Sequence, residues 1–411
     1  MKRILLIILS VALLFTLAAP AVTLATPPNG NLKVNTDIDS GEYGDASDAT
    51  AAVAGVPPEI TSPAAILIEK STGTVIFEKN ADELREPASI TKIMTILLVI
   101  EAIEAGTLTL KEMVTTSAHA AGMGGSQIYL RENERMSVHN MLQATVVNSA
   151  NDASVALGEH IAGSEAAFVS MMNARAAELG MTQTTFTNCS GLIESEEHRT
   201  TARDIAIMSV ELMKHDLVRD YTMMWMDSLR GGETALVNTN RLIRFFEGAT
   251  GLKTGFTSTA GYCLSATAER DGIEYIAVVL GDATSEDRFE SSRALLTYAF
   301  ATYTVASVRP ENVLLPIRVD LGRTDYIQPE TIGAEALLVT RTDVAALTQT
   351  LEVTDKLLAP VAVGDEVGTL TIKSGDSVLA EIKIVASEAS AKLNWGEIYG
   401  KFVEMLFVPV A

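Results

Sequence analysis

Apolar and polar residues alternate along the chain with two different periods, one typical of strands and the other typical of helices. Residues 64–69 and 75–77 alternate with a period of two around the turn-forming Ser71-Thr72-Gly73, so the pattern predicts a β-hairpin. Apolar residues at helical spacing predict helices at 90–105, 138–161, 164–179, 201–213 and 288–300. Strands are expected at 261–268 and 274–280, joined by a tight turn at Asp271-Gly272.

This order of elements indicates a fold class. A hairpin, a run of helices and then two strands are typical of an α/β core in which the last strands pair with the first hairpin. After about residue 304 the pattern becomes short, β-rich and interrupted by turns, which predicts a small antiparallel β-domain over 304–390. Its strands are expected at 313–319, 337–340, 348–353, 368–372 and 378–385. No cluster of His, Cys or acidic residues lies there, so we interpret this domain as a spacer or docking module.

The first 57 residues have the pattern of an export signal and a tether. Lys2 and Arg3 precede an apolar run at 4–17 that is too short to span a membrane, and small residues follow up to Ala25. Residues 1–25 are therefore predicted to be a signal peptide, which places the protein outside the cytoplasm. Residues 26–57 carry Pro, Gly and scattered acids with little apolar material, so we expect a disordered tether.

The last 21 residues, 391–411, form an amphipathic pattern. Trp395, Ile398, Tyr399, Phe402 and Met405 repeat at helical spacing, and polar residues repeat on the opposite face. One interpretation is a helix docked on its own domain, and the other is an interfacial anchor on the outer face of the cytoplasmic membrane. The pattern alone does not decide between them.

Composition narrows the classes of function. The 411 residues include 52 acidic and 31 basic side chains, a net charge of −21, which argues against nucleic acid as a partner. Two cysteines, Cys189 and Cys263, cannot staple a fold of this size, and the second is expected to be a buried structural thiol. None of the five histidines has metal-ligand spacing, so we expect neither a metal nor another cofactor.

A serine and a lysine three residues apart are the first candidate for chemistry. Ser89 and Lys92 open the most apolar predicted helix, where this spacing puts both side chains on one face. A buried lysine can lose its proton and act as the base for a hydroxyl nucleophile. Free N–H groups at a helix start also suit an oxyanion. The motif occurs once in the chain, although a helix cap would explain Ser89 equally well.

Two further motifs, each unique in the chain, complete a constellation. Ser149-Ala150-Asn151 offers a hydroxyl to relay a proton and an amide to orient a partner. Lys253-Thr254-Gly255 lies before the predicted strand 261–268, and on an edge strand it would suit capture of a peptide and its carboxylate. Taken singly, these pieces are also explained by a turn and a β-bulge. Their occurrence together is typical of serine enzymes that react with penicillin.

With these motifs the sequence resembles the low-molecular-mass penicillin-binding proteins, the serine-type D-alanyl-D-alanine carboxypeptidases. The resemblance spans about 58–385 and rests on the sequences at 86–92, 125–127, 148–153, 251–255, 260–262 and 358–368. It implies the penicillin-binding-protein and β-lactamase-like α/β fold, an antiparallel sheet with a helical subdomain, as a catalytic domain over 58–303. It also implies that the C-terminal helix is a membrane anchor.

The resemblance also implies a role for each residue. Ser89 would attack the carbonyl between two terminal D-alanines of a peptidoglycan stem pentapeptide, and Lys92 would take its proton. Ser149 would protonate the leaving D-alanine, and Asn151 would orient Lys92 and the substrate. The strand residues Lys253, Thr254, Gly255 and Phe256 would bind substrate, with an oxyanion hole formed by the N–H groups of Ser89 and Phe256. β-Lactams would acylate Ser89 and leave slowly.

The sequence departs from the family pattern at one position, and it leaves three alternative functions open. The family often has His where this chain has Phe256, and this departure bears on substrate preference and pH dependence rather than on the oxyanion hole. A β-lactamase would need a glutamate that activates water, and Glu194, Glu196 and Glu197 have no obvious motif around them. A D,D-endopeptidase would use the same acyl chemistry, and a non-enzymatic β-lactam sensor would keep the same pocket.

Overall fold

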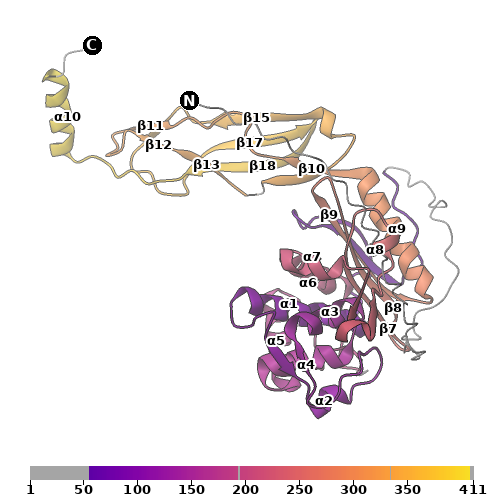
Figure 1. Ribbon diagram of the computed structural model, residues 1–411. Coiled ribbons are helices and arrows are strands. Elements are labelled where there is room, and N and C mark those ends of the chain that lie inside the picture. Colours follow the sequence, from indigo (N-terminus) through magenta and orange to yellow (C-terminus); the bar gives the residue numbers. More distant parts are fainter. Residues whose placement is uncertain (1–54, 193–194, 334, 408–411) are drawn as a thin grey trace, which may run out of the picture. The chain divides into compact units, whose positions relative to one another are not determined.

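The computed structural model describes residues 55–192, 195–333 and 335–407 (Figure 1). The predicted signal peptide lies outside the described residues, as does nearly all of the predicted tether. Within the described ranges, a five-stranded antiparallel sheet has the order β2-β1-β9-β8-β7. Its strands are β1 (Ala64–Glu69), β2 (Val75–Lys79), β7 (Ala249–Thr257), β8 (Gly261–Arg270) and β9 (Ile273–Asp282). The predicted hairpin and its pairing with the last strands are thus confirmed.

Both faces of this sheet are covered, which the alternating pattern did not indicate. All six residues of β1 are buried. Ile66 and Val278 point into a core shared with the central helices, whereas Leu67 and Val279 point into a core shared with α9 (Ser285–Thr302). The alternation in β1 therefore separates two apolar cores rather than a core from solvent.

The helices at 88–222 pack on the face of the sheet that carries Ile66 and Val278. A 3₁₀ turn, η1 (Ala88–Thr91), precedes α1 (Lys92–Glu104), so the predicted helix begins with a tighter turn that carries Ser89. The single helix expected at 138–161 is wrong, because residues 148–150 separate α3 from α4 and Ser149 has a left-handed φ of +57°. The helices are α3 (Val138–Val147), α4 (Asn151–Ala162), α5 (Glu165–Glu178), α6 (Ala202–Leu212) and α7 (Asp216–Thr222).

Several short elements were not expected from the sequence. They are β3 (Met113–Thr115), α2 (Ala118–Ala121), β4 (Arg135–Ser137), β5 (Met226–Leu229), η2 (Arg230–Gly232), β6 (Thr234–Val237) and α8 (Leu242–Phe245). Their lengths of three or four residues are too short for a periodic pattern to emerge. β3 pairs with β4, and β5 pairs with β6.

The C-terminal part is β-rich, as predicted, with its own apolar core that includes Val319, Leu370 and Ile384. Its sheets have the orders β12-β11-β16, β13-β18-β17-β15 and β10-β14. One pair, β11 with β16, is parallel, so the expectation of a purely antiparallel domain is wrong in this detail. The elements are β10 (Tyr303–Ser307), β11 (Ile317–Asp320), β12 (Tyr326–Ile327), β13 (Pro329–Ile332), β14 (Ala336–Thr340), η3 (Val344–Ala346), β15 (Leu347–Val353), β16 (Lys356–Leu358), β17 (Glu366–Ser374), β18 (Ser377–Ala386) and α10 (Trp395–Phe407).

Candidate active site

The η1 turn brings Ser89 and Lys92 together. The Nζ atom of Lys92 lies 3.0 Å from the Oγ atom of Ser89. Lys92 is fully buried, whereas Ser89 is partly exposed, so the hydroxyl is the accessible member of the pair. Burial lowers the pKa of Lys92 to about 7, against a smaller opposing effect of Cys189 and Asp152. At neutral pH a large fraction of this amine is therefore unprotonated.

Two further acceptors fix the amine of Lys92. It donates to Oδ1 of Asn151 at 2.6 Å and to the backbone oxygen of Ser190 at 2.7 Å. Asn151 begins α4 and is itself held by the loop before β4, since its Nδ2 donates to the backbone oxygen of Gly124 at 2.8 Å. The amide thus has one end on the lysine and the other on the loop.

Ser149 contributes a hydroxyl without a partner. It lies in the break between α3 and α4, is 3% exposed, and its Oγ atom makes no hydrogen bond within the described part of the chain. A buried hydroxyl that is unpartnered in the free protein costs free energy. Such an atom is a candidate for contact with a bound molecule.

Strand β7, at one edge of the sheet, carries the Lys253-Thr254-Gly255 motif against the η1 turn. A Cβ atom on Gly255 would lie 2.9 Å from the backbone oxygen of Pro87 and 3.2 Å from the backbone nitrogen of Ile90. Only a residue without a side chain permits this approach. The expected position on an edge strand is confirmed, and the glycine explains how the strand comes so close to Ser89.

The side chains of this strand segment are buried except for the last. Lys253 is 1% exposed and Thr254 is 5% exposed, whereas Phe256 is 52% exposed. Desolvation, followed by the charges of Lys92 and Arg288, lowers the pKa of Lys253 well below its ordinary value. A cationic lysine in this position would be stabilised by a bound anion.

An aromatic stack borders the same strand. The ring of Phe256 lies on that of Tyr262, with centroids 4.3 Å apart, and the guanidinium carbon of Arg288 is 5.2 Å from the centroid of Tyr262. Arg288 also donates to the backbone oxygen of Gly255 at 3.1 Å. Phe256 therefore presents an apolar surface at the place where the family often has a histidine.

Several residues around the site were not identified from the sequence. The segment 188–192 supplies the backbone oxygen that binds Lys92, and Asp152 accepts hydrogen bonds from the backbone N–H groups of Ile128 and Leu130. Asp152 could have been found from the sequence, because it directly follows the Ser149-Ala150-Asn151 motif. For the segment 188–192 no motif stood out, because its contribution is made by backbone atoms.

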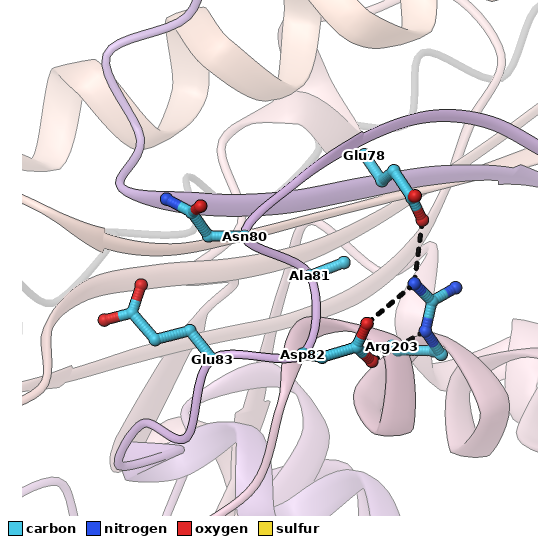
Figure 2. Close-up of a pocket in the computed structure, with 6 residues that line it drawn as sticks. All are labelled: Glu78, Asn80, Ala81, Asp82, Glu83 and Arg203. Atoms are coloured by element: carbon cyan, nitrogen blue, oxygen red, sulfur yellow. Dashed lines mark hydrogen bonds and ion pairs between the residues drawn. The ribbon is translucent and has the colours of Figure 1, made fainter.

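A pocket lined by charged residues lies elsewhere in the described part of the chain (Figure 2). Its residues are Glu78, Asn80, Ala81, Asp82, Glu83 and Arg203. Arg203 binds Asp82 and Glu78, and this guanidinium lowers the pKa of Asp82. Strand β2, which carries Glu78, is at the opposite edge of the sheet from β7, so this pocket is separate from the site around Lys253.

One group of side chains has the composition of a metal site. Carboxylate oxygens of Glu101 and Glu211 and a ring nitrogen of His215 lie within 4.8 Å of one another. Arg175 binds both carboxylates, at 2.7 and 2.9 Å. The guanidinium already provides the positive charge that these carboxylates need, so the group gives no support for a metal cofactor.

Comparison with known proteins identifies the family. The model of the D-alanyl-D-alanine carboxypeptidase family matches residues 50–284, and the model of the penicillin-binding protein 5 C-terminal domain matches residues 316–392. The chain is 41% identical over 336 residues to the D-alanyl-D-alanine carboxypeptidase DacF of Bacillus subtilis, covering 80% of this chain and 86% of the relative. It is 32% identical over 360 residues to DacC of Escherichia coli, covering 85% and 89%.

Solved structures of penicillin-binding proteins have the same fold as this chain. Penicillin-binding protein 5 from Haemophilus influenzae has a TM-score of 0.75 at 26% identity and covers 82% of this chain and 99% of its own. The ampicillin-bound form of penicillin-binding protein D2 from Listeria monocytogenes has a TM-score of 0.54 at 33% identity, over 59% of this chain and 100% of its own. The expected penicillin-binding-protein fold is confirmed, and the chain belongs to the D-alanyl-D-alanine carboxypeptidase family of serine-type peptidases.

Proposed function

We propose that the protein removes the terminal D-alanine from peptidoglycan stem pentapeptides through an acyl-enzyme on Ser89. The observation that carries this proposal is the 3.0 Å approach of Ser89 Oγ to the amine of Lys92. Because burial lowers the pKa of that amine to about 7, it can accept the hydroxyl proton at neutral pH.

The first half of the reaction forms the ester. Ser89 Oγ bonds to the carbonyl carbon of the penultimate D-alanine while its proton passes to Lys92 Nζ. The tetrahedral intermediate then expels the amine of the terminal D-alanine, which needs a proton to leave. Ser149 donates that proton and recovers one from Lys92, a role that suits its buried and otherwise unpartnered hydroxyl. Water then attacks the ester, and Ser89 is regenerated.

The strand β7 supplies substrate binding. Lys253 holds the carboxylate of the terminal D-alanine, and the anion in turn raises the pKa of Lys253 and keeps it protonated. The hydroxyl of Thr254, which donates to Oγ1 of Thr239 at 2.7 Å in the free protein, turns to the same carboxylate. Gly255 permits the substrate-binding strand to lie against the η1 turn. The backbone N–H groups of Ser89 and Phe256 form the oxyanion hole, and Asn151 orients Lys92 and the substrate amide.

β-Lactam antibiotics are proposed as a second class of ligand. They mimic the D-alanyl-D-alanine terminus, so the same attack by Ser89 would open the lactam ring and leave an ester. Water would remove this ester slowly. The ampicillin-bound relative from Listeria monocytogenes supports this proposal, since its sequence is 33% identical to the chain.

The test of the proposed function is release of free D-alanine from a pentapeptide that ends in D-Ala-D-Ala. Wild type should release D-alanine, and Ser89→Ala should release none and bind no fluorescent penicillin. Circular dichroism would show that the variant is folded. Penicillin labelling of Ser89→Ala would disprove the nucleophile assignment, and wild type that binds penicillin without releasing D-alanine would disprove the carboxypeptidase activity.

A D,D-endopeptidase activity is the second candidate, because one specific relative favours it. The D-alanyl-D-alanine endopeptidase of Escherichia coli is 32% identical over 220 residues, which is 52% of this chain. Cross-linked muropeptide dimers offered beside the pentapeptide would separate the two activities. A β-lactamase is less well supported, since the side chains of Glu196 and Glu197 are exposed. Rapid turnover of a chromogenic cephalosporin would favour a β-lactamase instead.

We also propose that the protein is exported and bound to the outer face of the cytoplasmic membrane. In this proposal residues 1–25 direct export, 26–57 tether the catalytic domain at 58–303, and the β-rich domain at 304–390 separates it from α10. No helix among the described residues is both long and apolar enough to span a membrane. The exposed Trp395, Tyr399 and Phe402 of α10 support interfacial binding instead.

A further inference from the structure

A buried histidine lies behind the nucleophile. His198, in the segment before α6, is 3% exposed. Its Nδ1 atom accepts a hydrogen bond from the backbone N–H of Thr187 at 3.0 Å. A backbone N–H can only donate, so Nδ1 must carry a lone pair and the proton of the neutral ring must be on Nε2.

The protonated nitrogen lies next to Thr91, the residue directly before Lys92. His198 Nε2 lies 2.8 Å from Oγ1 of Thr91, and that hydroxyl donates to the backbone oxygen of Ala88 at 2.7 Å. A carbonyl oxygen can only accept, so the hydroxyl proton is directed to Ala88 and His198 must donate to Thr91. The three hydrogen bonds thus have one consistent direction, from Thr187 through His198 and Thr91 to Ala88.

The end of this chain of hydrogen bonds is the residue directly before the nucleophile. Ala88 has a φ of +47°, a left-handed conformation that a residue with a side chain rarely adopts. Because Ala88 and Ser89 share a peptide unit, the direction of the Ala88 carbonyl also sets the direction of the Ser89 N–H. A bond that fixes this carbonyl therefore helps to orient the backbone of the nucleophile.

The neutral state of the ring agrees with this geometry. Burial, and then the charge of Arg199, lower the pKa of His198 to about 4. Arg199 is paired with Glu86 at 3.0 Å, and the ring of Phe186 lies beside the imidazole at a tilt of 60°, with centroids 5.9 Å apart. Oγ1 of Thr187 also lies 3.2 Å from Nδ1, but protonation would place an N–H on Nδ1 against the backbone N–H of Thr187 at 3.0 Å. The bond from that backbone N–H therefore requires the neutral ring.

We propose that His198 is a positioning residue for the acylation step, which acts through Thr91 on the Ala88 carbonyl and so holds Ser89 in its reactive orientation. It touches neither the substrate nor the reacting atoms. The inference rests on the proposed role of Ser89 as the nucleophile. In the sequence this histidine gave no signal, because its partners are about a hundred residues away and eleven residues away along the chain.

Two pairs of matched variants test the proposal. His198→Gln places an amide N–H₂ near the position of Nε2 and keeps a donor to Thr91, whereas the shorter His198→Asn reaches Thr187 but not Thr91. Thr91→Ser keeps the hydroxyl, whereas Thr91→Val removes it at nearly the same volume. The readouts are the limiting acylation rate and the half-saturating concentration with a fluorescent penicillin, together with the thermal midpoint.

We expect His198→Asn and Thr91→Val to lower the limiting acylation rate by roughly ten- to a hundredfold, the order expected for a small misplacement of a reacting group. The half-saturating concentration should change little, since the binding strand is untouched. His198→Gln and Thr91→Ser should stay within about threefold of wild type. The double variant His198→Asn with Thr91→Val should be no slower than the slower single variant, because both remove the same hydrogen bonds.

The outcomes against the proposal are distinct from those against the proposed function. Equal acylation losses in His198→Gln and His198→Asn, additive losses in the double variant, or a lower thermal midpoint with an unchanged acylation rate would each overturn the positioning role. Thr91→Val provides the same test if His198→Asn does not fold. Failure of the proposed function would appear separately, as penicillin labelling of Ser89→Ala or as absence of D-alanine release by wild type.

Discussion

Gly191 passes directly over the backbone oxygen of Ala88. A Cβ atom built on Gly191 would lie 1.8 Å from that oxygen and 2.7 Å from Oγ1 of Thr91, and Gly191 has a φ of +74°. The neighbouring Ser190 binds the amine of Lys92 through its backbone oxygen. The segment 188–192 and the η1 turn therefore form one packed unit, in which a glycine permits the contact that positions the lysine.

Gly191→Ala is expected to abolish penicillin acylation, because the new methyl group would push the segment 188–192 off the η1 turn. Gly163→Ala is the matched control. Its φ of +82° is similarly left-handed, but nothing lies within 4 Å of the new Cβ. Both variants should lose about 1–2 kcal/mol of stability from the backbone conformation. Acylation that survives in Gly191→Ala, or that is equally lost in Gly163→Ala, would contradict this account.

The rate of acylation should rise with pH around 7. Burial lowers the pKa of Lys92 to about 7, and only the unprotonated amine can accept the proton of Ser89. Below that pH the protonated form dominates, so the rate at saturating β-lactam should fall about tenfold per unit. Above it the rate should reach a plateau. The measurement is the acylation rate with a fluorescent penicillin from pH 5 to 9.

Lys92→Arg is the matched control for the pH profile. Arginine keeps the positive charge but does not lose its proton in this range, so it cannot serve as a base. We expect no acylation at any pH tested. An arginine variant that acylates, or a wild-type profile that is flat from pH 5 to 9, would show that Lys92 is not the base.

Much of this site could be predicted because its side chains form local motifs. Ser89 with Lys92 and Ser149 with Asn151 are close in sequence, so spacing alone places each pair on one helix or turn. Gly255, the glycine after Lys253-Thr254, was also part of the motif, but the sequence did not show why a glycine is needed there. That reason is the approach of β7 to Pro87, a contact between segments more than 160 residues apart.

The contributions that were not predicted come from backbone atoms and distant partners. The oxygen of Ser190 binds Lys92, and any residue type would provide such an oxygen. His198 lies in no motif of the sequence, and its bond to Thr91 joins residues 107 positions apart. The break at 148–150 was missed as a helix end because apolar residues at helical spacing lie on both sides of it, although the residues at the break itself are mostly polar.

Asp152→Asn should lower both stability and acylation. The buried carboxylate accepts N–H bonds from Ile128 and Leu130, and these hold the loop whose Gly124 oxygen binds Asn151. An asparagine would turn one N–H₂ toward these donors, at a cost of about 1–3 kcal/mol for unsatisfied groups. The readouts are the thermal midpoint and the acylation rate with fluorescent penicillin.

Asp204→Asn separates the two effects of the Asp152 change. Asp204 is also a buried carboxylate that accepts a backbone N–H, from Gln183 at 3.0 Å, but it has no contact with the loop or with Asn151 among the described residues. The Asp204→Asn variant should lose about as much stability as Asp152→Asn does, and it should acylate at the wild-type rate. If both variants acylate at the wild-type rate, the loop held by Asp152 does not position Asn151.

The exposed face of α10 should determine membrane binding. Trp395, Tyr399 and Phe402 are 87%, 69% and 57% exposed and recur at a spacing of four and three residues, which places them on one face. Burial of one such ring in the interface contributes about 1.5–3 kcal/mol. Changing all three to Ser should therefore weaken binding to phospholipid vesicles at least about a hundredfold, measured by co-sedimentation, without changing D-alanine release.

Glu404→Ser is the control for this face, because Glu404 is exposed on the same helix and contributes no apolar ring. Its vesicle binding should stay near the wild-type level or rise slightly with anionic lipid, since a negative charge is removed. Deletion of residues 391–411 should release the protein as completely as the triple variant does. If the deletion is released and the triple variant is not, other residues of 391–411 bind the membrane. If neither is released, α10 is not the anchor and the N-terminal apolar run is the remaining candidate.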